Sequence, residues 1–463
     1  MRARALLAGS LVGALLTSGL SCGGPDRPEA TVHAEPSPSV APAPDPSPKT
    51  PTSIRPSTSI PPAAPTGPSI RVTDGRTVVA LDPATGGRRA AWTDAAISLE
   101  GNWTVARDGD AGASWFDAYG VLDRTGQVPA GLEPTITSAD GRWAVFAEPA
   151  PPTRPGEIGP GRTTSHFVVT DGAGSTQEMT LDGNYVPEAF GWFGETAGQG
   201  NDSSARPMSL QLIEYLPPEH PTHYRVRTLD LATGAIGLPV SLRDKGQLVD
   251  EAMAGLSRTQ VYAASSSLLF TLYQPADVTS SDLDVPDYAV WEYGFVHTLA
   301  TPSAGVWCID LPEELGMSGN SGALALSPHE QVLYVVTGAG KLGVINVANP
   351  TDLRVSRTAD LGVVLDGEEQ PVIAAGSDHV WIGMDRQLLM IDPSTLDVQG
   401  RAELPAPVTA LTLDPTTHEL LAAGDGQLQR WTVDESRAEG TVVTPTATLP
   451  LPDGLGLIAR IAT

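Results

Sequence analysis

The stretch that decides the fold is Gly322–Asn346, which reads GALALSPHEQVLYVVTGAGKLGVIN and begins a run of three similar units that ends at residue 434. Each unit contains an apolar strand, a second short strand and a third strand that runs into a turn, at Asn346, Asp392 or Asp434, after which a polar fourth strand follows. Asp and Asn side chains bond to the backbone two residues on, Pro presets φ and Gly supplies positive φ. Four short antiparallel strands that recur every ~40 to 50 residues are typical of a β-propeller blade.

The same turn signal recurs along the rest of the chain and predicts the number of blades. Comparable turns lie near Asp82, Asp123–Gly126, Asp171–Gly174, Asp230–Gly234, Ala300–Gly305, Asn346, Asp392 and Asp434. They indicate eight units, or seven if one irregular unit is not a blade. The first unit lacks its first strand, and the alternating apolar residues of Leu455–Ile461 can supply it. We therefore predict an all-β chain with one closed propeller over residues 70–463, because a strand shared between the ends leaves no open sheet edge.

The charge of the chain narrows the range of its partners. The 463 residues carry a formal net charge of -26. A surface of this sign repels nucleic acid and anionic lipid. We expect no nucleic-acid partner, no direct binding to the membrane surface, and a monomeric propeller.

Residues 1–21 have the form of an export signal. A basic start precedes an apolar run that is too short to favour a transmembrane span. The sequence Gly19-Leu20-Ser21-Cys22 resembles the bacterial lipoprotein box, in which the Cys is lipidated after cleavage, although the Leu of that motif is shifted by one position here. We predict lipidation at Cys22 and a place in the cell membrane or cell envelope. The alternative is ordinary secretion with an unmodified Cys22.

Residues 22–69 form the second part of the predicted organisation. The segment Pro25–Ser69 holds 14 of the 42 prolines, interleaved with Ser, Thr and Ala. A segment of this composition cannot bury enough apolar surface to offset the entropy lost on ordering. We predict a disordered stalk that holds the propeller away from the membrane.

Insertions between strands indicate where a ligand binds. Pro151–Arg162, Pro217–His223 and Pro275–Gly294 all lie between the second and third strands of successive units, whereas Thr196–Pro207 lies between a first and a second strand. The three that share a position should emerge on one face, and loops on a rigid scaffold commonly carry binding residues. The candidate ligand-binding residues are Arg154, Arg162, His220, His223, Tyr288, Trp291 and Tyr293.

Two of the insertions also contain residue types that bind metals. Asp282, Asp284 and Asp287 provide hard oxygen ligands for a calcium ion, although their spacing is not that of an EF-hand, so a solvated acidic loop is the alternative. His220, His223 and Glu219 have side chains of the kinds that bind zinc. They lack helical spacing and a further ligand nearby, which favours a polar loop. Apart from this possible calcium, we expect no cofactor.

Part of the sequence resembles a known repeat. Tyr334-Val335-Val336-Thr337-Gly338 followed by Gly343-Val344-Ile345-Asn346 is similar to the Tyr-Val-Thr-Asn (YVTN) repeat of WD40-like bacterial surface propellers. Other segments, among them Leu212–Pro217 and Cys308–Pro312, are similar to a group of exported bacterial propeller proteins without an assigned reaction. Together the resemblances imply an exported bacterial propeller lipoprotein.

These observations predict a binding or interaction module at the cell surface, with an unknown protein or small molecule as its ligand. The alternative is an extracytoplasmic propeller enzyme, a lactonase-like or other hydrolase or an oxidoreductase, that acts at the central funnel. No residue pattern identifies a catalytic group.

Overall fold

A computed structural model describes most of the chain from residue 69 onward. The described residues are 69–82, 85–154, 157–191, 207–241, 253, 258–273, 294–301, 305–316, 321–349, 353–365, 369–414, 419–433, 443–451 and 457–462. The chain divides into two units, Met1–Ser59 and Ile60–Thr463. The fold below is that of the second unit.

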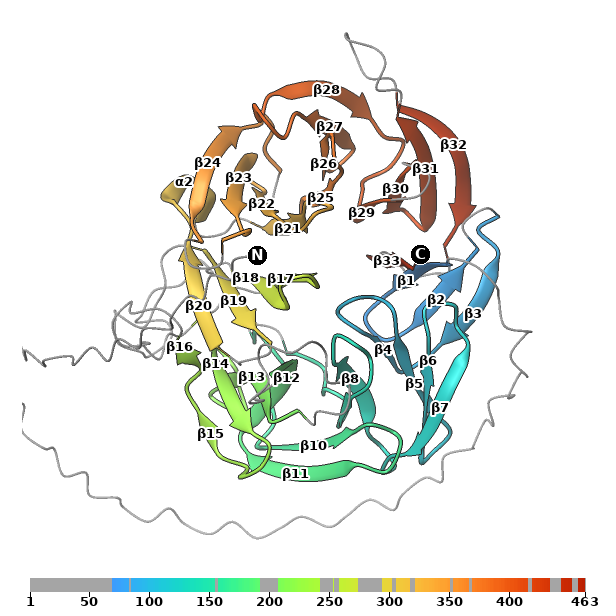
Figure 1. Ribbon diagram of the computed structural model, residues 1–463, viewed down its shortest axis with the longest axis vertical. Coiled ribbons are helices and arrows are strands. Elements are labelled where there is room, and N and C mark those ends of the chain that lie inside the picture. The colour runs from blue at the N-terminus through green and yellow to red at the C-terminus, as the bar shows by residue number, and fades with distance from the viewer. Residues whose placement is uncertain are drawn as a thin grey trace, which may run out of the picture. The chain divides into compact units, whose positions relative to one another are not determined.

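Eight antiparallel sheets follow one another around a ring in this unit (Figure 1). From the innermost to the outermost strand, blade 1 contains β33 (Leu457–Ala462), β1 (Ser69–Thr73), β2 (Val78–Leu81) and β3 (Arg88–Trp92). Blade 2 contains β4 (Ala95–Ile97), β5 (Thr104–Asp108), β6 (Gly112–Phe116) and β7 (Leu122–Gln127). Blade 3 contains β8 (Glu133–Thr137), β9 (Ala144–Ala147), β10 (Thr164–Thr170) and β11 (Thr176–Asp182). Blade 4 contains β12 (Asn184–Gly191), β13 (Ser209–Leu216), β14 (His223–Asp230) and β15 (Ile236–Gly237).

The second half of the ring repeats the pattern. Blade 5 contains β17 (Arg258–Ala263), β18 (Leu268–Tyr273), β19 (Phe295–Ala300) and β20 (Gly305–Asp310), and it is followed by the single turn of helix α2 (Glu313–Gly316). Blade 6 contains β21 (Gly322–Leu326), β22 (Val332–Thr337), β23 (Lys341–Asn346) and β24 (Val355–Asp360). Blade 7 contains β25 (Val372–Ala375), β26 (Val380–Met384), β27 (Gln387–Ile391) and β28 (Val398–Glu403). Blade 8 contains β29 (Ala410–Leu413), β30 (Glu419–Gly424), β31 (Gln427–Val433) and β32 (Val443–Pro450).

The predicted fold class, the count of eight and the shared closing strand are confirmed. β33 pairs antiparallel with β1, with Ile461 opposite Ile70 and Leu457 opposite Thr73. Blade 5 departs from the regular plan, because β16 (Val240–Ser241) adds a parallel fifth strand next to β20. The chain that leaves blade 4 therefore also extends the outer edge of blade 5.

The turns between third and fourth strands have the predicted chemistry, with one correction. Asp171 Oδ1 accepts a hydrogen bond from Ala173 N at 2.8 Å, and Asp230 and Asp392 act in the same way. In blade 2, however, the predicted turn Asp123–Gly126 is wrong, because these residues lie inside β7. The turn begins at Asp117, where Gly120 supplies the required positive φ of 79°. The turn expected at Asp434 lies outside the described residues.

A second recurring turn joins the first and second strands in three blades. A Ser at its start accepts a hydrogen bond from the backbone N of the residue five positions later, at 3.0 to 3.1 Å. The residue three positions after the Ser has positive φ, which explains why it is Gly in two of the three cases. These turns are Ser98–Trp103, Ser138–Trp143 and Ser327–Val332.

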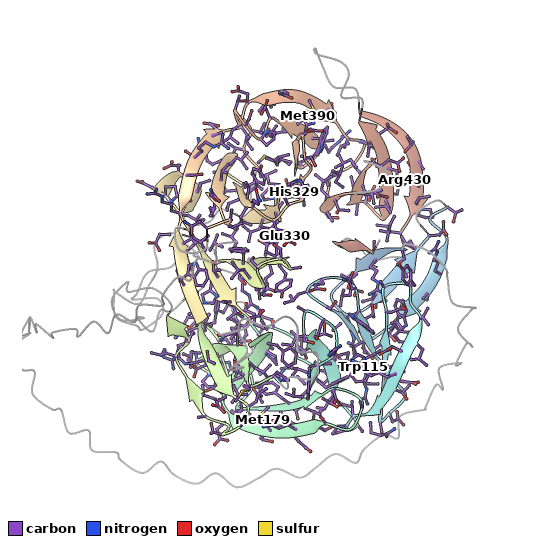
Figure 2. The ribbon with its side chains drawn as sticks, viewed as in Figure 1. Trp115, Met179, His329, Glu330, Met390 and Arg430 are labelled. Atoms are coloured by element: carbon purple, nitrogen blue, oxygen red, sulfur yellow. The ribbon has the colours of Figure 1, made fainter. Side chains whose placement is uncertain are left out.

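Neighbouring blades are held together by apolar clusters and by side chains that cross to the next blade. One cluster of buried residues lies at each junction in the described part of the ring. In addition, Arg124, Gln177 and Arg357 on outer strands donate to backbone carbonyls in the third-to-fourth-strand turn of the following blade. Toward the ring centre, Glu330 of blade 6 accepts hydrogen bonds from Ala264 N and Ser265 N of blade 5, at 3.1 and 2.7 Å (Figure 2).

Candidate functional site

The inserted loops occupy the strand positions predicted for them. The three loops begin after β9, β13 and β18, so each joins the second and third strands of its blade. The loop that follows β12 joins a first and a second strand. Because strands alternate in direction within a blade, the first three loops leave from one face of the ring, in three successive blades. We call this the loop face.

The loops of blades 3 and 4 are bonded to each other through their backbones. Ile158 N donates to Pro221 O at 3.0 Å, and Arg162 N donates to Pro218 O at 2.8 Å. The buried Asn184, which begins β12, donates from Nδ2 to a carbonyl of each loop, Pro160 O at 2.6 Å and Pro218 O at 3.0 Å. The two loops therefore form one rigid platform.

Three charged or polar side chains lie together on this platform. Arg154 Nη1 is 3.1 Å from His220 Nδ1, and the same ring nitrogen is 3.0 Å from Glu157 Oε1. Arg154 N also donates to Glu157 Oε2 at 3.1 Å. The hydrogen bond from His220, helped by the bond from Arg154 N and by the Arg154 charge, holds the pKa of Glu157 below its usual value against the opposing effect of burial. The structure thus brings two of the candidate residues, Arg154 and His220, into contact with each other and with Glu157.

The other two described candidates are less exposed than Arg154 and His220. His223 is buried beside the Thr222 hydroxyl, 3.2 Å from its Nδ1, and burial together with the Arg225 charge lowers its pKa although Glu214 opposes this. The Arg162 guanidinium is half-buried, and burial lowers its pKa against the effect of Glu148. His223 is therefore shielded from a ligand at the platform surface, whereas Arg162 remains partly exposed.

Several predicted site residues cannot be placed. The following candidates lie outside the described residues: Cys22, the aromatic residues Tyr288, Trp291 and Tyr293, and the calcium candidates Asp282, Asp284 and Asp287. Within the described ranges, no three His, Cys, Asp or Glu side chains are grouped to hold a metal ion. The helices described here include none that is long and apolar enough to cross a membrane.

Beneath the platform is a layer of aromatic side chains that the sequence analysis did not identify. We call this layer the aromatic floor. Its members lie next to the points where the loops leave and rejoin the sheets: Tyr215, Tyr224, Tyr273 and Phe295. The ring centroids of successive members are 5.9, 6.0 and 5.3 Å apart. Ile158 of the blade 3 loop packs on it, and a Cβ on Gly159 would be 2.5 Å from the Tyr215 ring. The floor thus supports the loops of blades 3 and 4 and includes both ends of the blade 5 loop.

A buried ion pair joins blades 4 and 5 at the same level. Glu188 lies at a bulge in β12, and its side chain is 8% exposed. It accepts hydrogen bonds from the Tyr273 hydroxyl and from Gln260 Nε2, and Arg258 Nη1 is 3.6 Å away. Burial raises the pKa of Glu188, while Arg258 and the Tyr273 hydroxyl act to lower it. The sequence marks only one member of this pair, as a single acid within the apolar segment Tyr185–Phe190, and does not indicate its partner.

Comparison with known proteins finds only distant similarity. No protein-family model matches the chain, and no curated protein matches it. Similar solved structures include dihydro-heme d1 dehydrogenase NirN (16% identity, 84% of this chain and 76% of that chain, TM-score 0.41). BamB from Moraxella catarrhalis is 12% identical over 83% of this chain and 93% of that chain, with a TM-score of 0.39. Sqt1 from Saccharomyces cerevisiae is 11% identical over 78% of this chain and 85% of that chain, with a TM-score of 0.43. Similarity at this level carries no argument about function, and the sheet topology itself shows that the chain is an eight-bladed β-propeller.

Proposed function

We propose that this protein is a binding module on the outside of a bacterial cell, that its ligand contacts the loop face of blades 3 to 5, and that lipid on Cys22 anchors it. The observation that supports this most directly is the bonding of two adjacent inserted loops into one platform over a shared aromatic floor. A neutral insertion into a surface loop needs no such support, because long loops are tolerated at small entropic cost. Loops held rigid before binding lose less entropy when a ligand is captured.

Among the described residues, the buried ion pair is the feature that most favours an enzyme. A carboxyl with a raised pKa is typical of general acids, but structural ion pairs produce the same shift. Glu188 is enclosed by Tyr273, Arg258 and Gln260, and its side chain is 8% exposed. Its oxygens are bonded to neighbouring side chains and largely shielded from solvent, so we assign the pair a structural role.

A comparison of two double variants tests the binding role. Arg154→Ser with His220→Ser removes the exposed side chains of the platform, where the exposed fractions are 64% and 65%. The matched control is Arg142→Ser with His329→Ser, which removes one Arg and one His from turns between first and second strands, on the opposite face. Each immobilised protein is incubated with solubilised envelope extract, and captured proteins and small molecules are quantified by mass spectrometry. We expect a ligand that the wild type and the control retain and the platform variant loses. Identical capture profiles for all three proteins would contradict a binding site on the platform.

The anchor is tested separately with the two cysteines of the chain. Cys22→Ala should move the protein from the membrane fraction to the soluble fraction, because a thioether-linked lipid holds a protein by burial of its acyl chains. Cys308→Ala in β20 is the control and should leave the protein with the membrane. If the Cys22 variant sediments as the wild type does, Cys22 is not the anchor.

A further inference from the structure

The outer surface of the platform presents an Arg and a His side chain, although the protein as a whole has a net charge of -26. The side chains of Arg154 and His220 are largely exposed, whereas that of Glu157 is only 9% exposed. Glu157 lies below the other two as a brace, with one oxygen near the His220 ring and the other bonded to Arg154 N. A ligand that approaches from solvent therefore meets the guanidinium and the imidazole before it meets the carboxylate.

The position of His220 Nδ1 makes this arrangement sensitive to protonation. The atom lies 3.1 Å from Arg154 Nη1 and 3.0 Å from Glu157 Oε1. The guanidinium is always a donor and the carboxylate is an acceptor, so one ring nitrogen cannot bond to both at once. A neutral imidazole whose Nδ1 is unprotonated accepts from Arg154, whereas an Nδ1 that carries a hydrogen, as in every protonated imidazole, donates to Glu157.

The change of partner alters both the charge of the group and the availability of Arg154. With a neutral imidazole, the charges of Arg154 and Glu157 cancel and one Nη1 donor is occupied by His220. With a protonated imidazole, the three side chains carry a net positive charge and Glu157 is bonded to His220. Arg154 then keeps only its 3.7 Å ion pair with Glu157 Oε1, and the rest of its fork faces solvent. An Arg fork beside a protonated imidazole suits a planar or tetrahedral oxyanion.

We propose that Arg154 and His220 form an oxyanion-binding pair that holds a carboxylate or phosphate group of the ligand, and that protonation of His220 strengthens this binding. The proposal rests on the proposed binding function and names the chemistry of its ligand. The charged groups that face His220 from the neighbouring loop are Arg154 and Glu157. On its own loop, Glu219 precedes His220, and Pro221 and Thr222 separate it from His223, whose Nδ1 contacts the Thr222 hydroxyl.

Histidine ring NMR tests the pair without knowledge of the natural ligand. Protein labelled with 15N-histidine is titrated with sodium formate as the carboxylate probe and sodium sulfate as the tetrahedral probe, at constant ionic strength. Both anions keep their charge between about pH 5.5 and pH 7.5, the range in which histidine titrates. The signals of His220 are assigned by their loss in His220→Gln. Arg154→Gln is the test variant, and Arg142→Gln on the opposite face is its matched control.

We expect one or both anions to shift the His220 signals to saturation, with an affinity about two- to five-fold higher at the lower pH because one exposed charge is added. The shift should disappear in Arg154→Gln and persist in Arg142→Gln. The anion-free neutral spectrum should show an unprotonated Nδ1, as acceptance from Arg154 requires.

Shifts that never saturate, or that survive in Arg154→Gln, would overturn the proposal. If the platform variant loses its envelope ligand while neither anion saturates, the binding function stands and only the oxyanion assignment fails. If an anion saturates but capture is unchanged, the pair exists and the proposed function fails.

Discussion

Tyr273 at the end of β18 and Glu188 in β12 join two blades through atoms that lie 85 residues apart in the chain. The Tyr273 hydroxyl is 2.8 Å from one oxygen of Glu188 and 2.9 Å from the other. Tyr273 is also a member of the aromatic floor, so this contact ties the base of the blade 5 loop to the blade that carries half of the platform. The loop face is therefore supported from below by a polar link and by an apolar layer.

Glu188→Gln should destabilise the protein by about 1 to 3 kcal/mol, because it leaves Arg258 without its counterion in a setting where the Arg side chain is 28% exposed. Tyr273→Phe, which removes only a hydroxyl, should cost about 1 kcal/mol. Urea unfolding measures both free energies. An unchanged midpoint for Glu188→Gln would show that the ion pair contributes nothing to the junction.

Stability should fall in acid because of His297, which is buried in β19 with its ring centroid 6.0 Å from that of Tyr273. Burial lowers the pKa of His297 from 6.5 to about 4. Between these two values the unfolded chain binds the proton and the folded chain does not, so the free energy of unfolding decreases by about 3 kcal/mol as the pH falls to 4. Unfolding measured across this range should show a smaller decrease for His297→Phe. The exposed His329→Gln is the control and should follow the wild type. Equal slopes for all three proteins would rule out His297 as the titrating group.

Arg124→Lys should destabilise the junction of blades 2 and 3 although it keeps the charge. The guanidinium lies over the rings of Trp103 and Trp115, 5.6 and 5.1 Å from their centroids. It also donates to three backbone carbonyls, those of residues 141, 142 and 171. A Lys ammonium cannot reproduce this fork, so we expect a loss of about 2 to 3 kcal/mol by urea unfolding. Arg142→Lys at the surface should change stability by less than about 0.5 kcal/mol. Similar losses for both variants would contradict a special role for Arg124.

Deletion of residues 457–463 should open the ring, because β1 would lose its partner along Ser69–Thr73. We expect aggregation, or a fall of roughly 10 °C or more in the unfolding temperature, since several kcal/mol of pairing and packing disappear. Deletion of residues 22–68 is the control and should leave the unfolding temperature unchanged if that segment is a stalk outside the fold. Scanning calorimetry measures both. A ring that melts normally without β33 would show that closure does not depend on this strand.

The sequence by itself determined the features that depend on local chemistry. Alternation of apolar residues and turn-forming Asp, Asn and Gly gave the blades, their number and the strand position of every insertion, because these signals act between residues close in the chain. The same locality explains the error in blade 2, where Asp123–Gly126 has turn composition but Asp117 with Gly120 forms the turn. Amino-acid composition alone did not show which of these two neighbouring segments forms the turn.

Only the tertiary structure decided which side chains form the site. Arg154 and His220 are 66 residues apart, and their contact exists because two loops of adjacent blades bond to each other on one face. His223 looked equivalent to His220 in the sequence, but it begins β14 opposite Leu216 and is buried, whereas His220 remains in the loop. The ion pair of Glu188 and Arg258 was equally hidden, because no local pattern indicates which strands of a ring meet at a junction. Contacts between blades are set by the closure of the ring, and that closure is a property of the whole chain.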